Sequence, residues 1–221
     1  MSILADIITN KEGLYTGDLK YYFKCLFNSR GANNPYHNIR HSCTVLVRCY
    51  EGLKYSQDIL EKQVGLRYLK RLNRALLISA IFHDSEHPGK SGNDDLNIEM
   101  AVRSWKKLAL KEDRDDETIF DYVINLIQST EFGPNGHVMT VHGEYSKILR
   151  DADLTQICSD AWIRMILFGL SEEMGVAPIE MLRMQEGFLK NLKFESQWGQ
   201  QFNGVIQEKI AEANELLRIV E

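Results

Sequence analysis

Apolar side chains recur along the chain at intervals of three and four residues, which is the spacing of one face of an α-helix. The last segment shows this clearly, with Phe202, Val205, Ile206, Ile210 and Ala213 on one stripe. Alternation of the kind that marks strands is almost absent. The pattern predicts helices over residues 2–10, 19–27, 35–49, 59–74, 75–83, 98–108, 119–127, 149–158, 162–170, 179–192 and 202–220. We therefore predict an all-α fold.

The most unusual segment runs from residue 75 to residue 89. Residues 75–83 carry hardly a polar side chain, so we expect a helix buried on nearly all sides. It ends in His83 and Asp84, and His87 follows one turn later if the helix continues that far. A Pro-Gly pair then stops it. Because a buried charge persists only when it is paired or binds a metal, this segment predicts a metal site.

The composition is that of an ordinary folded protein. The chain has 221 residues, of which 44% are apolar and 26% charged. No linker or repeat divides it, so we predict a single domain, 1–221. The formal net charge of −5 arises from mixed signs along the chain, so nothing resembles the basic stripe of a protein that binds a nucleic-acid polymer.

The location of the protein is predicted from its N-terminus and its apolar runs. The first residues lack the basic start of a signal peptide. No apolar stretch reaches the ~18 residues of a membrane span. The four cysteines have neither metal-binding nor disulfide-scaffold spacing. We expect a cytoplasmic protein with no membrane partner and with reduced thiols.

One helix face is basic. Arg67, Lys70, Arg71 and Arg74 repeat at helical spacing within the segment 59–74. Such a row is either a solvated face or a patch for an anionic partner. The first alternative is the usual one.

The histidines are the main candidates for chemistry. Four of the six form two pairs at i and i+4, His37 with His41 and His83 with His87. This spacing lets two imidazoles converge on one ion, or on an ion and a neighbouring substrate. A bound divalent ion usually recruits another carboxylate, and residues 151–153 offer two. The further acidic candidates are Asp151, Asp153, Glu99 and Glu131, whereas His137 and His142 are interpreted as ordinary loop residues.

Together these residues resemble the His-Asp (HD) superfamily of metal-dependent phosphohydrolases, and most of all the catalytic domain of class I cyclic-nucleotide phosphodiesterases. Residues 36–41, Tyr-His-Asn-Ile-Arg-His, are similar to the Y-H-N-x-x-H motif. Residues 83–89, His-Asp-Ser-Glu-His-Pro-Gly, are similar to H-D-x-x-H-P-G. Residues 152–154 match A-D-L, and residues 185–188 match Q-x-G-F. The resemblance implies a compact multi-helix domain with a metal site between helices.

The resemblance also implies roles for individual residues. The implied ligands of a tightly bound ion are His41, His83, Asp84 and Asp153, with Asp84 bridging to a second ion beside His87 and Glu99. The implied general acid is His37, and the implied substrate-binding residues are Tyr36, Gln185 and Phe188. The sequence departs from the family pattern in an extra Gly92 before Asn93, in Gln156 where the family has Asn, and in residues 97–100, which lack the family's two histidines.

The expected reaction is hydrolysis of a phosphodiester, with a 3′,5′-cyclic nucleotide as the leading substrate and a 5′-nucleotide as product. Hydroxide between two cations attacks phosphorus in line, while a histidine supplies the proton that the leaving alkoxide needs. Imidazole and carboxylate ligands suit zinc, iron or manganese at the tight site and magnesium or manganese at the second. The expected partner is a small-molecule nucleotide, and the oligomeric state stays open.

Two alternatives stay open at this point. One is a different HD phosphohydrolase, either a nucleotide phosphomonoesterase or a guanosine tetraphosphate hydrolase. The other is a non-catalytic HD module that keeps the metal for stability and binds a nucleotide. Retention of His37 favours an enzyme, because a binding module needs no proton donor.

Overall fold

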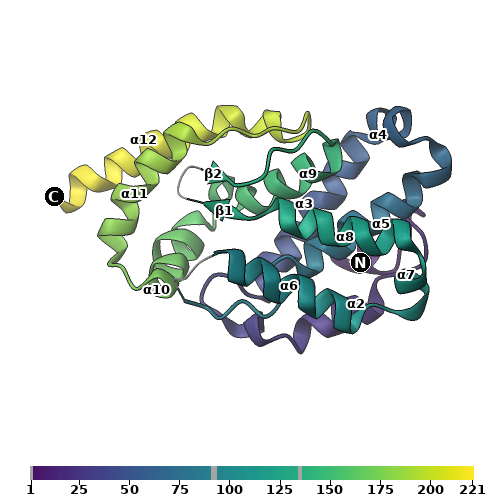
Figure 1. Cartoon of the computed structure of the whole chain (residues 1–221). Helices are drawn as coiled ribbons and strands as arrows, with labels where there is room; N and C mark the ends of the chain where they lie inside the picture. The colour runs from purple at the N-terminus through teal and green to yellow at the C-terminus, as the bar shows by residue number, and fades with distance from the viewer. Residues whose placement is uncertain (1, 91–93, 134–135) are drawn as a thin grey trace.

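The structure, a computed structural model, describes residues 2–90, 94–133 and 136–221 (Figure 1). Its regular structure is nearly all helical, which confirms the predicted all-α fold. The α-helices are α1 (Ile3–Ile8), α2 (Lys20–Phe27), α3 (Ile39–Tyr55), α4 (Gln57–Val64), α5 (Leu66–Phe82), α6 (Asp94–Leu108), α7 (Lys111–Asp115), α8 (Glu117–Ser129), α9 (Glu144–Leu154), α10 (Ser171–Met174), α11 (Pro178–Asn191) and α12 (Asn203–Val220). Short 3₁₀ turns are η1 (Arg30–Asn33), η2 (Thr155–Cys158) and η4 (Gly199–Phe202), η3 (Ile163–Leu170) is a π-helix, and β1 (Phe132–Gly133) pairs with β2 (Gly136–His137) in an antiparallel hairpin.

Helix α5 is the centre of the larger hydrophobic core. It packs against α3 and α8, and α9 packs against α3 in turn. Every residue from Leu72 to Phe82 is buried, as predicted for the apolar segment. Apolar side chains on all sides of a helix leave it no solvent face, so α5 must be covered by neighbours.

A smaller core lies toward the C-terminal end of the chain. Helices α11 and α12 pack side by side and extend away from the larger core (Figure 1). With η3 they bury Trp162, Met181 and Ala213. Tyr36 also belongs to this cluster, so the segment just before α3 lies between the two cores.

Several predicted helix boundaries were wrong. The boundary between the predicted helices 59–74 and 75–83 lies at Gly65 instead of after residue 74, and α5 runs without interruption from Leu66. Gly65 has φ +74°, a left-handed conformation that only glycine adopts at little cost, so α4 ends there. The charged connection after Ala109 contains the short helix α7, and α9 begins at Glu144 rather than near residue 149. Residues 91–93, which include the extra Gly92 and the Asn93 that follows it, and residues 134–135 lie outside the described residues.

Neither interpretation of the basic face holds for Arg74, which is buried. Its Nε and Nη2 donate to the two oxygens of Asp113, each at 2.7 Å, and Nη1 donates to the carbonyl of Thr16 at 2.9 Å. Arg71 is paired with Asp116. A buried guanidinium needs such partners, since an unpaired charge there costs several kcal/mol.

Within the described ranges, no helix is both long enough and apolar enough to cross a membrane.

Candidate functional site

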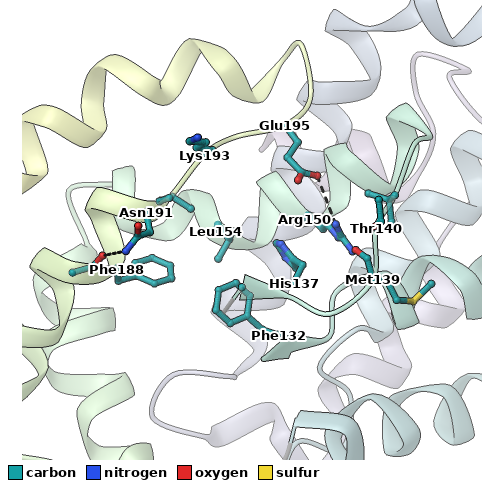
Figure 2. Close-up of a pocket in the computed structure, with 14 residues that line it drawn as sticks. Phe132, His137, Met139, Thr140, Arg150, Leu154, Phe188, Asn191, Lys193 and Glu195 are labelled. Carbon is teal, nitrogen blue, oxygen red and sulfur yellow. Dashed lines mark hydrogen bonds and ion pairs between the residues drawn. The ribbon is translucent and has the colours of Figure 1, made fainter. Parts of the chain in front are cut away.

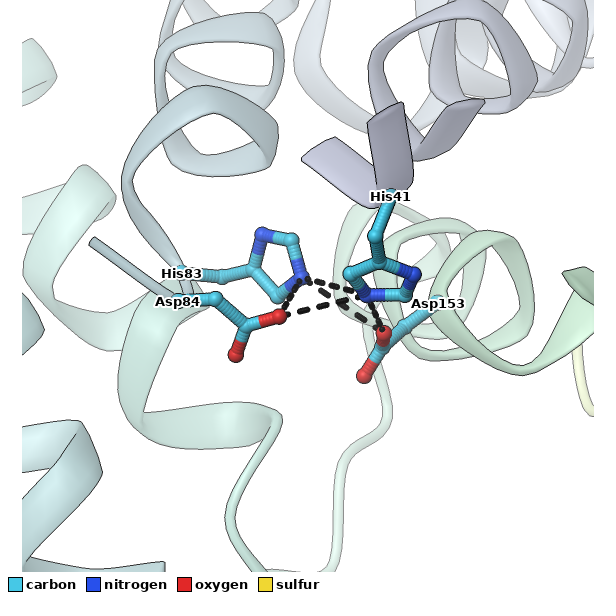
Figure 3. A group of neighbouring side chains, drawn as sticks. All are labelled: His41, His83, Asp84 and Asp153. Atoms are coloured by element: carbon cyan, nitrogen blue, oxygen red, sulfur yellow. Dashed lines mark hydrogen bonds and ion pairs between the residues drawn. The ribbon is translucent and has the colours of Figure 1, made fainter. Parts of the chain in front are cut away.

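Four side chains that the sequence predicted as metal ligands lie together between three helices (Figure 3). His41 is in the first turn of α3, His83 and Asp84 directly follow α5, and Asp153 is near the end of α9. Each residue offers one ligand atom, and these four atoms lie within 4.8 Å of one another. We call these residues the metal-ligand group.

The distances within the metal-ligand group fit a single ion. His41 Nε2 lies 2.9 Å from Asp153 Oδ1 and 3.2 Å from Asp84 Oδ2. His83 Nε2 lies 3.0 Å from Asp84 Oδ2, 3.5 Å from Asp153 Oδ1 and 3.4 Å from His41 Nε2. Ligands about 2.1 Å from one ion lie roughly 3.4 Å apart in a tetrahedral site and roughly 3.0 Å apart in an octahedral one. Both geometries are compatible with these separations.

The electrostatics of the metal-ligand group call for positive charge. Burial opposes protonation of His41, but the adjacent carboxylates of Asp153 and Asp84 outweigh it and raise the pKa of His41 to about 9. The pKa of His83 rises well above its ordinary value in spite of burial, because the same two carboxylates surround it. Two carboxylates facing two imidazoles are therefore stable only with added protons or with a cation. A divalent ion supplies that charge without protons.

The orientation of the two imidazoles also suits a metal. His83 Nδ1 lies 3.0 Å from the carbonyl oxygen of Ala80 and can donate a hydrogen bond to it, which leaves Nε2 free to ligate. Among the described residues, His41 Nδ1 has no hydrogen-bond partner. The ring of Tyr36 packs against His41 instead, with centroids 4.9 Å apart. Asp84 Oδ2 is buried between the imidazoles with no well-aligned hydrogen bond from the described residues, as expected of a ligand atom.

A second group, His37, His87 and Glu173, adjoins the first. Glu173 Oε2 accepts a hydrogen bond from His37 Nδ1 at 2.6 Å, and Oε1 accepts from the backbone nitrogens of Tyr36 and His37 at 2.7 and 2.9 Å. The rings of His37 and His87 stack with centroids 4.0 Å apart. The ring centroids of His37 and His41 are 5.8 Å apart, so the two groups are neighbours. We call this second set the proton-donor group, after the role that the family resemblance implies for His37.

The charge of Glu173 is held by the same contacts. Burial opposes its ionisation, but hydrogen bonds from His37 and the backbone lower the pKa of Glu173 below its ordinary value. Burial and the nearby His37 lower the pKa of His87. A carboxylate that accepts from Nδ1–H of a histidine fixes the orientation of the ring. This contact leaves Nε2 as the other ring nitrogen of His37.

Sequence analysis missed Glu173, which lies 136 residues after His37. It sits in α10, directly after the π-helix η3, and π-helical turns often mark functional sites. Gly169 in that π-helix allows close approach, since a Cβ there would lie 2.7 Å from the carbonyl oxygen of Pro35. The signal in the sequence was a pair of acids at the end of the apolar stretch 162–170.

The predicted helix does not continue to His87, so the second i,i+4 pair is not one helical turn. Helix α5 ends at Phe82, and Glu86 adopts a left-handed φ of +70°. Gly89 is also left-handed, and a Cβ there would lie 2.5 Å from Asn34 Oδ1. Asn34 in turn donates to the His87 carbonyl at 2.9 Å. This compact turn directs His87 toward Glu173 instead of toward the metal-ligand group.

The first pair is likewise divided by a helix end. Helix α3 begins at Ile39, not at Pro35 as predicted, because the Asn38 side chain accepts hydrogen bonds from the backbone nitrogens of Arg40 and His41. His37 therefore precedes the helix, and its ring turns toward Glu173. The asparagine of the motif has a structural role as the helix cap.

Three acidic candidates lie outside both groups. Glu99, predicted beside the second ion, is 61% exposed and pairs with Arg103 at 2.6 Å. Asp151 is buried and accepts hydrogen bonds from the backbone nitrogens of Glu195 and Ser196 at 2.9 and 2.7 Å. Glu131 belongs to neither cluster. The structure thus does not bring Glu99, Asp151 or Glu131 to the candidate metal site.

The predicted substrate-binding residues are placed separately. Phe188 lines a cavity of about 850 Å³ beside Leu154, the residue that follows the ligand Asp153 (Figure 2). Gln185 is buried, and its amide nitrogen lies 3.3 Å from Met181 Sδ. Among the described residues, Gln185 is not part of the lining of this cavity. The role of Gln185 at a nucleotide base therefore stays a prediction.

No protein-family model matches this chain, and no curated protein matches it either. Its chemistry is therefore inferred from the geometry of the two groups and from the motifs that supply them.

Proposed function

We propose that the chain is a metal-dependent phosphohydrolase of the HD type that hydrolyses a nucleotide phosphodiester, with 3′,5′-cyclic nucleotides as the leading substrates. The observation that carries the proposal is the adjacency of the two groups. One combines two imidazoles and two carboxylates at metal-ligand distances. The other places a histidine, held by a buried glutamate, within 5.8 Å of the first, measured between the ring centroids of His37 and His41. Hydrolysis of a phosphate ester needs both an ion and a proton donor.

The two groups have separate tasks. His41, His83, Asp84 and Asp153 would hold the metal, which would activate water as a Lewis acid and screen the phosphoryl charge. The second carboxylate oxygen of Asp84 points away from both imidazoles (Figure 3). His37 donates a proton from Nε2 to the leaving alkoxide. Glu173 holds the ring of His37 in place through the hydrogen bond to Nδ1.

The proton-donor group favours an enzyme over a non-catalytic metal-stabilised module. A binding module needs no proton donor beside its metal ion. The choice between phosphodiester and phosphomonoester substrates rests on the likeness to cyclic-nucleotide phosphodiesterases. Assays must therefore include both classes of substrate.

The test is elemental analysis of the purified chain together with turnover of cyclic AMP, cyclic GMP, 5′-AMP and guanosine tetraphosphate, with Mg²⁺ or Mn²⁺ added. We expect bound metal and release of a 5′-nucleotide from a cyclic one. His37→Ala should keep the metal and lose about 10²- to 10⁴-fold in turnover. Asp84→Asn should lose both metal and turnover, whereas Asp115→Asn, at an exposed site on α7, should keep both.

The other outcomes redirect the assignment. Turnover of 5′-AMP or guanosine tetraphosphate without turnover of cyclic nucleotides would make the chain a different HD phosphohydrolase. Bound metal and bound nucleotide without turnover of any substrate would make it a binding module.

A further inference from the structure

A smaller cavity adjoins the turn that carries the predicted ligands His83 and Asp84. Its walls come from the end of α2 and the residues after it, from the end of α5 and the turn after it, and from the end of α6. The turn contributes Ser85 and Glu86, which directly follow Asp84. Among the described residues, the lining includes no member of the metal-ligand group or of the proton-donor group. We call this space the α2–α6 cavity.

One polar atom of the lining lacks a partner. The side chain of Ser85 lines the α2–α6 cavity and is buried, with 5% of its surface exposed. Its Oγ finds no hydrogen bond within the described part of the chain. A buried hydroxyl without a partner destabilises the folded state, so native proteins nearly always give such a group a partner. A molecule in the cavity is a partner that the chain itself does not supply.

The turn beside the cavity is tightly held. Ser85 N donates to the carbonyl of Phe82 at 2.9 Å, and His87 N donates to the carbonyl of Asp84 at 3.1 Å. Between them Glu86 has φ +70°, a left-handed conformation that is uncommon for a residue with a side chain. The position of the cavity wall and the position of Asp84 are therefore linked through one short run of backbone.

The lining favours a small ligand without charge. The volume of about 260 Å³ lies just below the range of about 300–1,000 Å³ for drug-sized ligands, which leaves room for a single ring or a short chain. The charged residues of the lining, Glu86 and Lys107, have opposite signs, and neither is buried. An ion would lose its hydration there without a buried countercharge. The buried apolar part of the lining consists of Leu26, Ile81 and Phe82.

We infer that the α2–α6 cavity binds a small uncharged molecule that has an apolar body and one hydrogen-bonding group, and that this group bonds to Ser85 Oγ. The bound molecule contacts the turn that carries Asp84, and it thereby changes the affinity of the metal-ligand group for its ion. Binding in the cavity is independent of the proposed function. The effect on the ion rests on that function, because it requires the metal-ligand group to hold a metal.

Cys25 serves as a reporter of binding, because it lines the cavity and is half-buried. Cys43 and Cys158 are also half-buried and lie outside this lining, so they are internal controls. The probes are benzyl alcohol, toluene, which lacks the hydroxyl, and benzoate, which carries a charge. Peptide mass spectrometry measures the rate at which iodoacetamide labels each thiol. We expect benzyl alcohol to slow the labelling of Cys25 several-fold, toluene and benzoate to slow it less, and the two control thiols to react as before.

Ser85→Ala removes the unpartnered hydroxyl and leaves the rest of the lining in place. Benzyl alcohol should then protect Cys25 no better than toluene does. The melting temperature of the variant without a probe should not fall, since the lost hydroxyl had no partner. The matched control is Ser129→Ala, which removes a buried hydroxyl that donates to the Leu126 carbonyl at 2.7 Å and should keep the difference between the two probes. An advantage of benzyl alcohol that survives in Ser85→Ala overturns the role of Ser85.

The link to the ion is tested with Mn²⁺. Benzyl alcohol should change the Kd of Mn²⁺ about fivefold or more, and Mn²⁺ should change the concentration of benzyl alcohol that half-protects Cys25 by the same factor. Labelling of Cys25 that benzyl alcohol does not slow, or slows equally at all three thiols, overturns the cavity site. Selective protection with an unchanged Kd of Mn²⁺ overturns the link alone. Selective protection in a protein that binds no metal removes the proposed function and leaves the cavity site standing.

Discussion

The substitution Glu173→Gln tests the proton-donor group with little change of shape. Glutamine keeps an oxygen for the backbone nitrogens of Tyr36 and His37, which Glu173 Oε1 binds at 2.7 and 2.9 Å. Its amide nitrogen replaces Oε2, the atom 2.6 Å from His37 Nδ1. An amide nitrogen donates and does not accept, so it cannot take the hydrogen bond from Nδ1–H that holds the ring of His37 in place. The ring is then no longer fixed with Nε2 toward the leaving group.

The size of the effect depends on the leaving group. A general acid contributes about 10²- to 10⁴-fold, so Glu173→Gln should slow hydrolysis of cyclic AMP by at least ~100-fold, or about 2.7 kcal/mol in the barrier. A p-nitrophenyl ester of thymidine 5′-phosphate has a leaving group that departs without a proton. The same variant should slow that reaction by less than about threefold.

The assay compares kcat for the two esters in wild type, His37→Ala, Glu173→Gln and Glu172→Gln. Glu172 is the exposed neighbour on α10 and serves as the control. Metal content should be the same in all four proteins, because neither glutamate belongs to the metal-ligand group. Equal losses on both esters would refute proton donation and would leave Glu173 with a purely structural role.

Three further predictions concern stability. Chelation of the metal should lower the free energy of unfolding, by about 2.7 kcal/mol if the ion is normally present at 100 times its Kd, and Asp153→Ala should remove this response in thermal melts. In Gly52→Ala the new Cβ would lie 2.6 Å from Ile148 Cγ2, so this variant should lose about 1–3 kcal/mol in the free energy of unfolding, measured by urea denaturation, through the contact between α3 and α9. Gly204→Ala has open space at its Cβ and is the control, which should leave the free energy of unfolding unchanged. The pKa of His137 is about 4 in the native state, below its ordinary value of 6.5, so between these pH values the unfolded state binds a proton that the native state does not. The free energy of unfolding of wild type relative to His137→Gln should therefore be highest above pH ~6.5 and fall toward pH 4, by at most about 3 kcal/mol. The measurement is the difference between the two denaturation series as a function of pH. A flat difference would place His137 in solvent.

The helices of the larger core could be predicted from sequence because they depend on local pattern. The run from Ala75 to Phe82 has Ser79 as its single polar residue, which favours a helix buried on all sides. The members of the metal-ligand group were predicted from the motifs that carry the family resemblance, and these motifs lie at or near the ends of helices. Gly65 escaped this reasoning because helical periodicity continues across it, although its left-handed φ breaks the helix.

The proton-donor group could not be completed from sequence, because its acid comes from a distant segment. Glu173 reaches His37 only through the π-helix that precedes α10 and the close approach of Gly169 to Pro35. Neither feature has a reliable sequence signature. His137 was dismissed as a loop residue for a similar reason, since only the hairpin brings it to Phe132.

The two histidine pairs are each divided between the two groups of side chains. Helix α3 begins between His37 and His41, whereas α5 ends before His83, so the second pair lies wholly beyond the helix. One member of each pair turns to the carboxylates of Asp84 and Asp153, and the other turns to Glu173. The start of α3 after His37 keeps this residue beside the metal-ligand group but outside it, with ring centroids of His37 and His41 5.8 Å apart. This is the arrangement that the proposed division between metal ligands and proton donor requires.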